Sequence, residues 1–156
     1  MAIARTALAL FALVLAAPVH AETAKAPTAP NPTASLTFHT KAGARTFTVE
    51  RALNEQARER GLMFRREMAD DHGMIFDFEG ERSVDMWMHN TYIPLDMVFI
   101  GADRAVKRVA RNTTPLSDKI ISSGGPALYV VELNGGEAGR AGIEPGNIVS
   151  GAALEK

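Results

Sequence analysis

The chain has 156 residues, no cysteine, and 17 Lys and Arg against 18 Asp and Glu. The absence of cysteine excludes disulfides, thiolate metal sites and thiol nucleophiles. Charges of both signs are interspersed without a basic stripe, which argues against nucleic acid or an anionic membrane surface as a partner.

The first 21 residues have the three parts of a secretory signal peptide. Arg5 precedes an unbroken apolar run over residues 7–17, and small residues flank a cleavage site after Ala21. The run ends at Pro18, short of the roughly 18–20 apolar residues that a transmembrane helix needs. We therefore expect an exported protein, periplasmic or extracellular, without stable membrane insertion after cleavage.

Residues 22–34 carry three prolines and no large apolar side chain. Nothing in this segment can be buried to offset the loss of chain entropy, so we predict a disordered linker. Residues 35–156 show no internal repeat and no second linker, which indicates one domain.

Alternating apolar and polar residues predict two strands over 36–39 and 45–50, joined by a turn that contains Gly43. A short helix is then predicted near 54–61. Asn54 provides its N-cap and Gly61 its left-handed end. Leu53, Ala57 and Leu62 are expected to face the core.

Further strands are predicted downstream. Residues 73–78 form one, closed by a turn at 79–82, with 84–88 as its antiparallel partner. The apolar run 97–100 is typical of a central strand buried on both faces.

A strand over 105–110 precedes a long loop predicted at 111–127, and strands at 128–133 and 148–149 complete the pattern. This arrangement favours a mainly β (α+β) fold, an antiparallel β-sandwich or partly closed barrel with one short helix. The glycine-rich stretch 135–142 lacks the spacing of a phosphate-binding loop and is interpreted as a tight connection.

Six of the seven methionines fall between residues 63 and 97. Thioethers commonly fill an irregular core, which is the preferred interpretation. The alternative is a Cu(I) site built from Met86, Met88 and His89, although strand parity places His89 on the opposite face from both methionines. No metal-ligand spacing and no cofactor motif occur, so no cofactor is expected.

The decapeptide 87–96 contains the chain's one tryptophan together with a polar loop. Its Asn, Thr, Pro and Asp residues are usual turn formers, but beside exposed aromatic rings they also suit a shallow pocket for a sugar, a peptide or a small polar ligand. Glu132 interrupts an apolar strand and needs a partner, with Arg65 or Arg66 as candidates. If Asp96 approached Glu132, one of them would be a candidate general acid.

Four blocks of residues resemble the domain of unknown function 192 family, at 61–65, 73–76, 87–96 and 129–136. The resemblance extends over roughly residues 45–150. It implies a compact, mainly antiparallel β fold with a short helix, and no activity. His89 stands where the family pattern is usually basic, which weakens any role for an imidazole. The polar or amphipathic signature residues are Arg65, Trp87, Asn90, Thr91, Asp96 and Glu132.

These observations lead to one hypothesis and two alternatives. The hypothesis is an exported binding or accessory domain whose ligand site consists of Arg65, Trp87, Asn90, Thr91 and Asp96. No catalytic constellation is recognisable, which favours binding over catalysis. An envelope hydrolase that uses Asp96 and Glu132 is therefore the first alternative and not the leading hypothesis. The second is a protein–protein interaction module of the cell envelope, which predicts an exposed apolar patch around Trp87 and Tyr92. The oligomeric state stays open.

Overall fold

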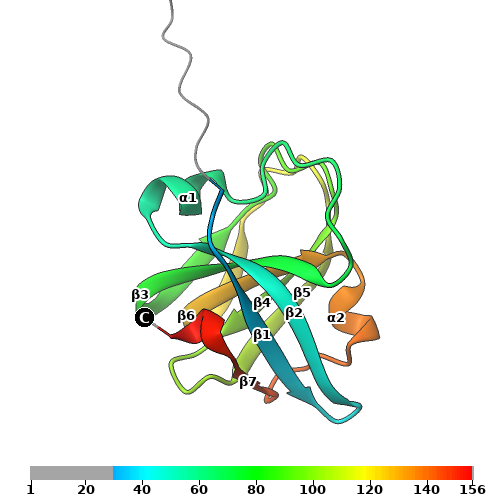
Figure 1. Ribbon diagram of the computed structural model, residues 1–156. Coiled ribbons are helices and arrows are strands. Elements are labelled where there is room, and N and C mark those ends of the chain that lie inside the picture. The colour runs from blue at the N-terminus through cyan, green and yellow to red at the C-terminus, as the bar shows by residue number, and fades with distance from the viewer. Residues whose placement is uncertain (1–29, 156) are drawn as a thin grey trace, which may run out of the picture.

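The structure is a computed structural model that describes residues 30–155 (Figure 1). The predicted signal peptide and most of the predicted linker therefore lie outside the described residues. Within residues 30–155 the elements are, in chain order, β1 (Thr33–Thr40), β2 (Gly43–Ala52), α1 (Glu55–Arg60), β3 (His72–Met86), β4 (Leu95–Ile100), β5 (Val106–Thr113), β6 (Ile121–Asn134), α2 (Glu137–Arg140), β7 (Ile148–Ser150) and a 3₁₀ turn, η1 (Ala152–Leu154).

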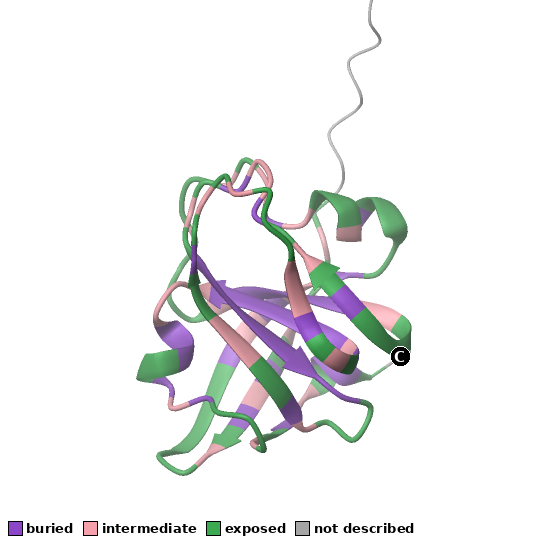
Figure 2. Ribbon diagram, turned by 180° about the vertical axis from the view of Figure 1, so that it is seen from behind, coloured by how far each residue is buried: buried purple, intermediate pink, exposed green. Residues whose placement is uncertain are grey.

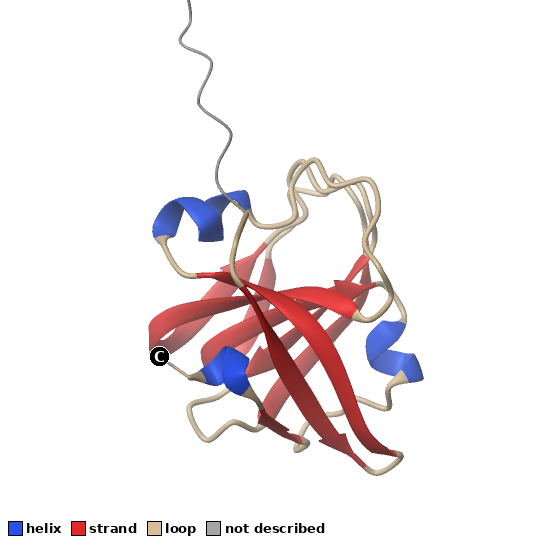
Figure 3. Cartoon of the chain, in the orientation of Figure 1, coloured by secondary structure: helices blue, strands red, loops and turns tan. Residues whose placement is uncertain are grey.

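The strands form a single curled sheet (Figure 3), and their order is β5-β4-β6-β3-β2-β1-β7. Its two ends meet, because Ala105 just before β5 pairs with Ile148 of β7, and the Val106 N–H donates to Asn147 O at 2.9 Å. Only the β2–β3 pairing is parallel among the strand pairs of the described chain. The prediction of a mainly β, partly closed barrel is confirmed.

Both faces of the middle of the sheet are covered. Inside the curl, residues such as Phe38, Val98 and Leu133 form one core, and on the outer face α1 and the neighbouring loops cover a second core that includes Phe76 and Met97. Every residue of β4 is therefore buried, as predicted for residues 97–100, and Figure 2 shows buried strands crossing the middle of the molecule.

Helix α1 forms as its capping residues predict. The Asn54 side chain accepts the Ala57 N–H at 2.8 Å, and Gly61 ends the helix with φ of 46°. Ala57 and Leu62 are buried, but Leu53 is 47% exposed, so its predicted place in the core is wrong. Leu53 lies between the end of β2 and the N-cap Asn54, outside both elements. No helix of the described segment is long and apolar enough to cross a membrane.

The structure corrects four element boundaries. Residues 73–78 and 84–88 were expected to pair across a turn, but His72–Met86 is one strand that pairs with β6 through two register shifts. Glu79, at φ of 63°, lies in the bulged stretch between Asp77 and Arg82. The predicted turn is therefore a β-bulge within β3.

The other three corrections concern loops. The predicted loop 111–127 shrinks to 114–120, because β5 and β6 extend into it from both sides. The glycine-rich stretch contains the unpredicted helix α2, and β1 begins two residues inside the predicted linker. In each case pairing or packing against distant residues extends order beyond what the local pattern indicates.

Candidate functional site

A pocket of about 510 Å³ opens on the outer face of the sheet, between α1, the second half of β3 and the segment that follows β3. Its size lies in the usual range for small-molecule sites. Its floor and walls mix apolar and charged side chains. The lining residues are Glu55, Arg58, Glu59, Arg60, Gly61, Leu62, Met63, Phe76, Phe78, Arg82, Asp85, Met86, Trp87, His89, Thr91 and Glu132.

Glu132 of β6 supplies a carboxyl group to this pocket from within the outer core. Its cross-strand neighbours are Met74 of β3 and Met97 of β4, both buried. Glu132 is 4% exposed, and none of the side-chain hydrogen bonds or ion pairs found within residues 30–155 involves its carboxyl group, which lines the pocket. Burial among apolar groups raises the pKa of Glu132 to about 8. The carboxyl group is therefore mostly protonated at neutral pH.

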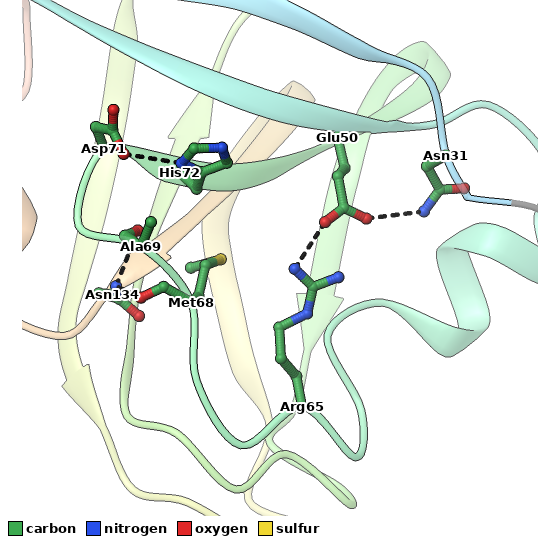
Figure 4. Close-up of polar contacts among 8 residues, drawn as sticks. All are labelled: Asn31, Glu50, Arg65, Met68, Ala69, Asp71, His72 and Asn134. Carbon is green, nitrogen blue, oxygen red and sulfur yellow. Dashed lines mark hydrogen bonds and ion pairs between the residues drawn. The ribbon is translucent and has the colours of Figure 1, made fainter.

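The two arginines expected to pair with Glu132 lie elsewhere, so that prediction is wrong. Arg65 Nη1 lies 2.7 Å from Glu50 Oε1, and Figure 4 shows this ion pair beside Asn31. The guanidinium of Arg66 lies over the ring of Tyr92, 5.3 Å from its centroid. Arg65 therefore ties the segment after α1 to β2 and does not line the pocket of Glu132.

Trp87 and His89 form an aromatic wall at the pocket. Their rings stack with centroids 4.9 Å apart and planes 27° apart. The imidazole Nδ1 lies 2.7 Å from Asp118 Oδ1, which holds the ring in place. Trp87 remains 48% exposed.

Two arginines lie in the part of the pocket that α1 and β3 form. The Arg82 guanidinium lies 5.2 Å from the centroid of the Phe78 ring. Arg58 donates to Asp77 O and to Glu79 Oε1, both at 3.1 Å. The charged groups of α1 and β3 thus surround the apolar interior of the pocket.

Asn90 and Thr91 shape the turn between β3 and β4. Asn90 has φ of 52°, a left-handed conformation that asparagine tolerates well. Thr91 is buried, and its hydroxyl donates to His89 O at 3.1 Å. Thr91 also lines the pocket, whereas Asn90 does not. The turn-forming interpretation therefore explains Asn90 fully and Thr91 in part.

Asp96 lies on the opposite face of the sheet from Glu132. In the β4–β6 register Asp96 pairs with Leu133 and Met97 with Glu132, so alternation directs the two carboxylates to opposite sides. Asp96 is fully buried, and it accepts the Asn112 N–H at 2.7 Å and the Ala138 N–H at 2.8 Å. It joins β5 and α2 to β4. The general-acid pair of Asp96 and Glu132 does not form.

The Cu(I) alternative also loses its geometric basis. Met88 is fully buried and its sulfur accepts the Thr113 hydroxyl at 3.0 Å, while Met86 and His89 line the pocket. The three side chains therefore do not share one site. In residues 30–155, no group of three or more His, Cys, Asp or Glu side chains is placed to hold a metal ion.

Three loops meet beside the pocket and form a surface of their own, which we call the three-loop surface. They cover residues 61–71, 87–94 and 114–120, and they gather at the end of the molecule beside α1 (Figure 3). The Phe64 N–H donates to Asn90 O at 2.8 Å, and the Leu116 N–H donates to Thr91 O at 3.0 Å. The large apolar side chains exposed there are Phe64, Trp87, Tyr92, Leu116 and Ile120.

Sequence reasoning missed the half of the pocket that α1 and β3 provide. In the sequence, nothing distinguishes Arg58 and Arg82 from ordinary surface charges, or Phe78 from an ordinary strand residue. The one available signal was Glu132, a carboxylate in an apolar strand. The parallel pairing of β2 with β3 and the antiparallel pairing of β3 with β6 together bring these residues to one pocket.

Comparisons with known proteins identify relatives but no activity. The family model DUF192, described as Uncharacterized ACR, matches residues 37–151. A crystal structure from Sinorhizobium meliloti 1021, described as that of a proposed transcription regulator, is 44% identical with a TM-score of 0.78, and covers 82% of this chain and 100% of its own.

A second crystal structure, of a protein of unknown function from Novosphingobium aromaticivorans, is 37% identical with a TM-score of 0.76. It covers 86% of this chain and 99% of its own. No curated protein matches the chain. The likeness therefore extends to sequence and fold across nearly the whole of both solved relatives.

Proposed function

Because the chain belongs to the DUF192 family, whose description names no activity, we propose a function from its own pocket: it is an exported domain that binds a small organic ligand between α1 and β3. The signal-like segment 1–21 supports export. The ligand lies against Trp87 at the wall and reaches Glu132 at the floor.

The observation that carries this proposal is the unpartnered carboxyl group of Glu132. Burying a polar group without a hydrogen bond costs about 1–3 kcal/mol. Leucine or methionine at position 132 would extend the core that Met74 and Met97 already form. A group that costs stability and faces a pocket is typical of a site that selection retains for binding.

A thermal-shift screen of small organic compounds tests the proposal. Wild type is compared with Glu132→Leu and Trp87→Ala, and Arg65→Ala serves as the control because Arg65 does not line this pocket. We expect Glu132→Leu to raise the melting temperature of the free protein and to abolish the ligand-induced shift. If Glu132→Leu unfolds the protein, the carboxyl group is structural and the proposal fails.

The three-loop surface favours a second candidate function, the docking of another envelope protein. Phe64 and Leu116 adopt the left-handed conformation, with φ of 64° and 59°, although both are bulky. Such backbone strain is usually retained where a function needs it. The strained residues also present exposed apolar side chains. Pull-down of envelope proteins with wild type and with Phe64→Asn would test this role, and equal capture by both proteins would exclude it.

Neither candidate involves nucleic acid. The word regulator describes the Sinorhizobium meliloti protein. This chain has 17 basic and 18 acidic residues, and neutralising phosphates requires clustered cations.

A further inference from the structure

We propose that the ligand of this pocket is an organic ammonium ion, a primary amine on an apolar or aromatic stem, whose charged head pairs with the carboxylate of Glu132. This inference rests on the proposed function and specifies its ligand class. It follows from what surrounds Glu132, what forms the walls, and how the charges balance.

The floor lacks the cation that a carboxylate requires. Glu132 has no ion pair within residues 30–155, and its strand neighbours Met74 and Met97 are apolar. The nearest candidates from the sequence, Arg65 and Arg66, are engaged with Glu50 and Tyr92. A ligand ammonium would provide the missing partner. A ligand carboxylate would place a second acid against the first.

The walls suit the stem and the charge of such a ligand. Aromatic faces attract cations through their quadrupoles and also cover apolar stems. Trp87 is 48% exposed at the pocket, and Phe76 and Phe78 also line it. The Arg82 guanidinium over Phe78 shows that this wall already holds one cation on a ring.

The remaining charges balance, so Glu132 determines the sign of the interior. The other charged or titratable lining groups are Glu55, Arg58, Glu59 and Arg60 from α1, Arg82 and Asp85 from β3, and His89 from the following loop. Three acids oppose three arginines. Ionisation of Glu132 gives the pocket the net negative charge that an ammonium ion needs.

Binding is consequently linked to release of a proton. Burial raises the pKa of Glu132 to about 8, so the empty pocket holds a neutral acid at pH 7. When the ammonium ion enters, the carboxyl O–H bond breaks, the proton leaves to solvent, and the carboxylate pairs with the ligand. Below pH 8 the amine affinity therefore rises about tenfold per pH unit, and above pH 8 it levels off.

The chain's single tryptophan provides a direct readout, because Trp87 lines the pocket. The probes are matched pairs with the same stem: phenethylamine with 2-phenylethanol, and butylamine with butanol. Each is titrated into the full chain between pH 6 and 9 while Trp87 fluorescence is recorded. We expect the amines to bind more tightly as pH rises to 8, and the affinity of the alcohols to stay level over that range.

The variant Glu132→Gln separates this inference from the proposed function. Glutamine mimics the neutral acid but cannot ionise. The affinity for amines should therefore fall at least tenfold and no longer depend on pH. The affinity for alcohols should be retained. His89 also lines the pocket and stacks on Trp87, so His89→Gln decides between the two groups. A pH slope that survives this change assigns the slope to Glu132, and a slope that disappears assigns it to the imidazole and overturns the inference. Calorimetry in two buffers of different ionisation enthalpy should detect one proton released per amine at pH 7.

The possible results lead to different conclusions. If amines and alcohols bind alike, with no pH slope and no effect of Glu132→Gln, the ammonium inference is overturned while the ligand pocket stands. If no member of either pair changes Trp87 fluorescence at millimolar concentration, both the inference and the proposed pocket are overturned.

Discussion

Asp96 of β4 and Glu132 of β6 lie one register position apart on neighbouring strands, yet their carboxyl groups face opposite sides of the sheet. Asp96 accepts two backbone N–H groups, from Asn112 and Ala138, whereas Glu132 has no partner within the described residues. Glycosidase chemistry needs two carboxyl groups flanking one substrate bond. The two residues therefore have separate roles, Asp96 in holding the fold and Glu132 in the pocket.

The first prediction concerns stability against pH. Burial raises the pKa of Glu132 from an ordinary value of 4.5 to about 8. Between these values the folded chain holds one proton more than the unfolded chain, so the free energy of unfolding falls as pH rises. The slope is about 1.4 kcal/mol per pH unit, or about 5 kcal/mol over the window. The contribution is fully present below pH 4.5 and lost by pH 8.

Glu132→Gln isolates this effect from the other titrating groups. Urea unfolding of both proteins should give similar free energies near pH 4.5 and a growing advantage for the variant up to pH 8. A constant difference across that range would show that Glu132 is ionised in the folded protein at all these pH values.

The second prediction tests the structural role of Asp96. In Asp96→Asn the new NH₂ group faces one of the two backbone N–H donors, so one charge-assisted hydrogen bond is replaced by a donor–donor contact. We expect a loss of about 2–4 kcal/mol in the free energy of unfolding, measured by urea denaturation. If the variant keeps its stability but binds ligand differently, Asp96 is a ligand-binding residue and not a structural one.

The third prediction concerns strain in the three-loop surface. Leu116 is 59% exposed at φ of 59°, a conformation that costs a leucine about 1 kcal/mol and that asparagine tolerates. Leu116→Asn should therefore stabilise the protein by about 0.5–1 kcal/mol in thermal unfolding. Leu53→Asn is the control, because Leu53 is similarly exposed without a positive φ, and it should give no gain.

The fourth prediction separates Arg65 from the pocket. Its ion pair with Glu50 is partly exposed, with side chains about one third and one fifth accessible. Arg65→Ala should cost about 1 kcal/mol or less in urea unfolding. It should leave Trp87 fluorescence titrations unchanged. A tenfold loss of affinity would place Arg65 in the ligand site after all.

The fifth prediction concerns the N-terminus. Expression of the full chain in a bacterium with a general secretion system should yield a mature protein that begins at Glu22, as measured by intact mass. Substituting Leu10 with Arg interrupts the apolar run and should block processing. A wild-type protein that keeps residues 1–21 after export would contradict the signal peptide.

Local pattern was enough for several elements because their determinants are neighbours in the chain. Asn54 caps α1 through Ala57, three residues away, and Gly61 ends the helix. The apolar run 97–100 shows on its own that both faces of β4 are buried. The sequence blocks around 61–65 and 87–96 also identified the family that the comparison confirms.

The pocket, in contrast, depends on pairings between distant residues. The bulges of β3, the parallel approach of β2 and the extension of β6 arise from hydrogen bonds to strands far away in sequence. No local pattern records them, which is why the 79–82 turn and the 111–127 loop were predicted wrongly.

The sequence by itself therefore determined the secondary structure of β4 and α1, the family, and the unusual carboxylate Glu132, because residue type and spacing act over a few positions. Only the tertiary structure decided that Asp96 is satisfied by backbone groups while Glu132, with no ion pair among the described residues, lines the same pocket as Trp87. The reason is physical: the face of a sheet, and what covers it, is set by the register of strands that meet across long stretches of chain.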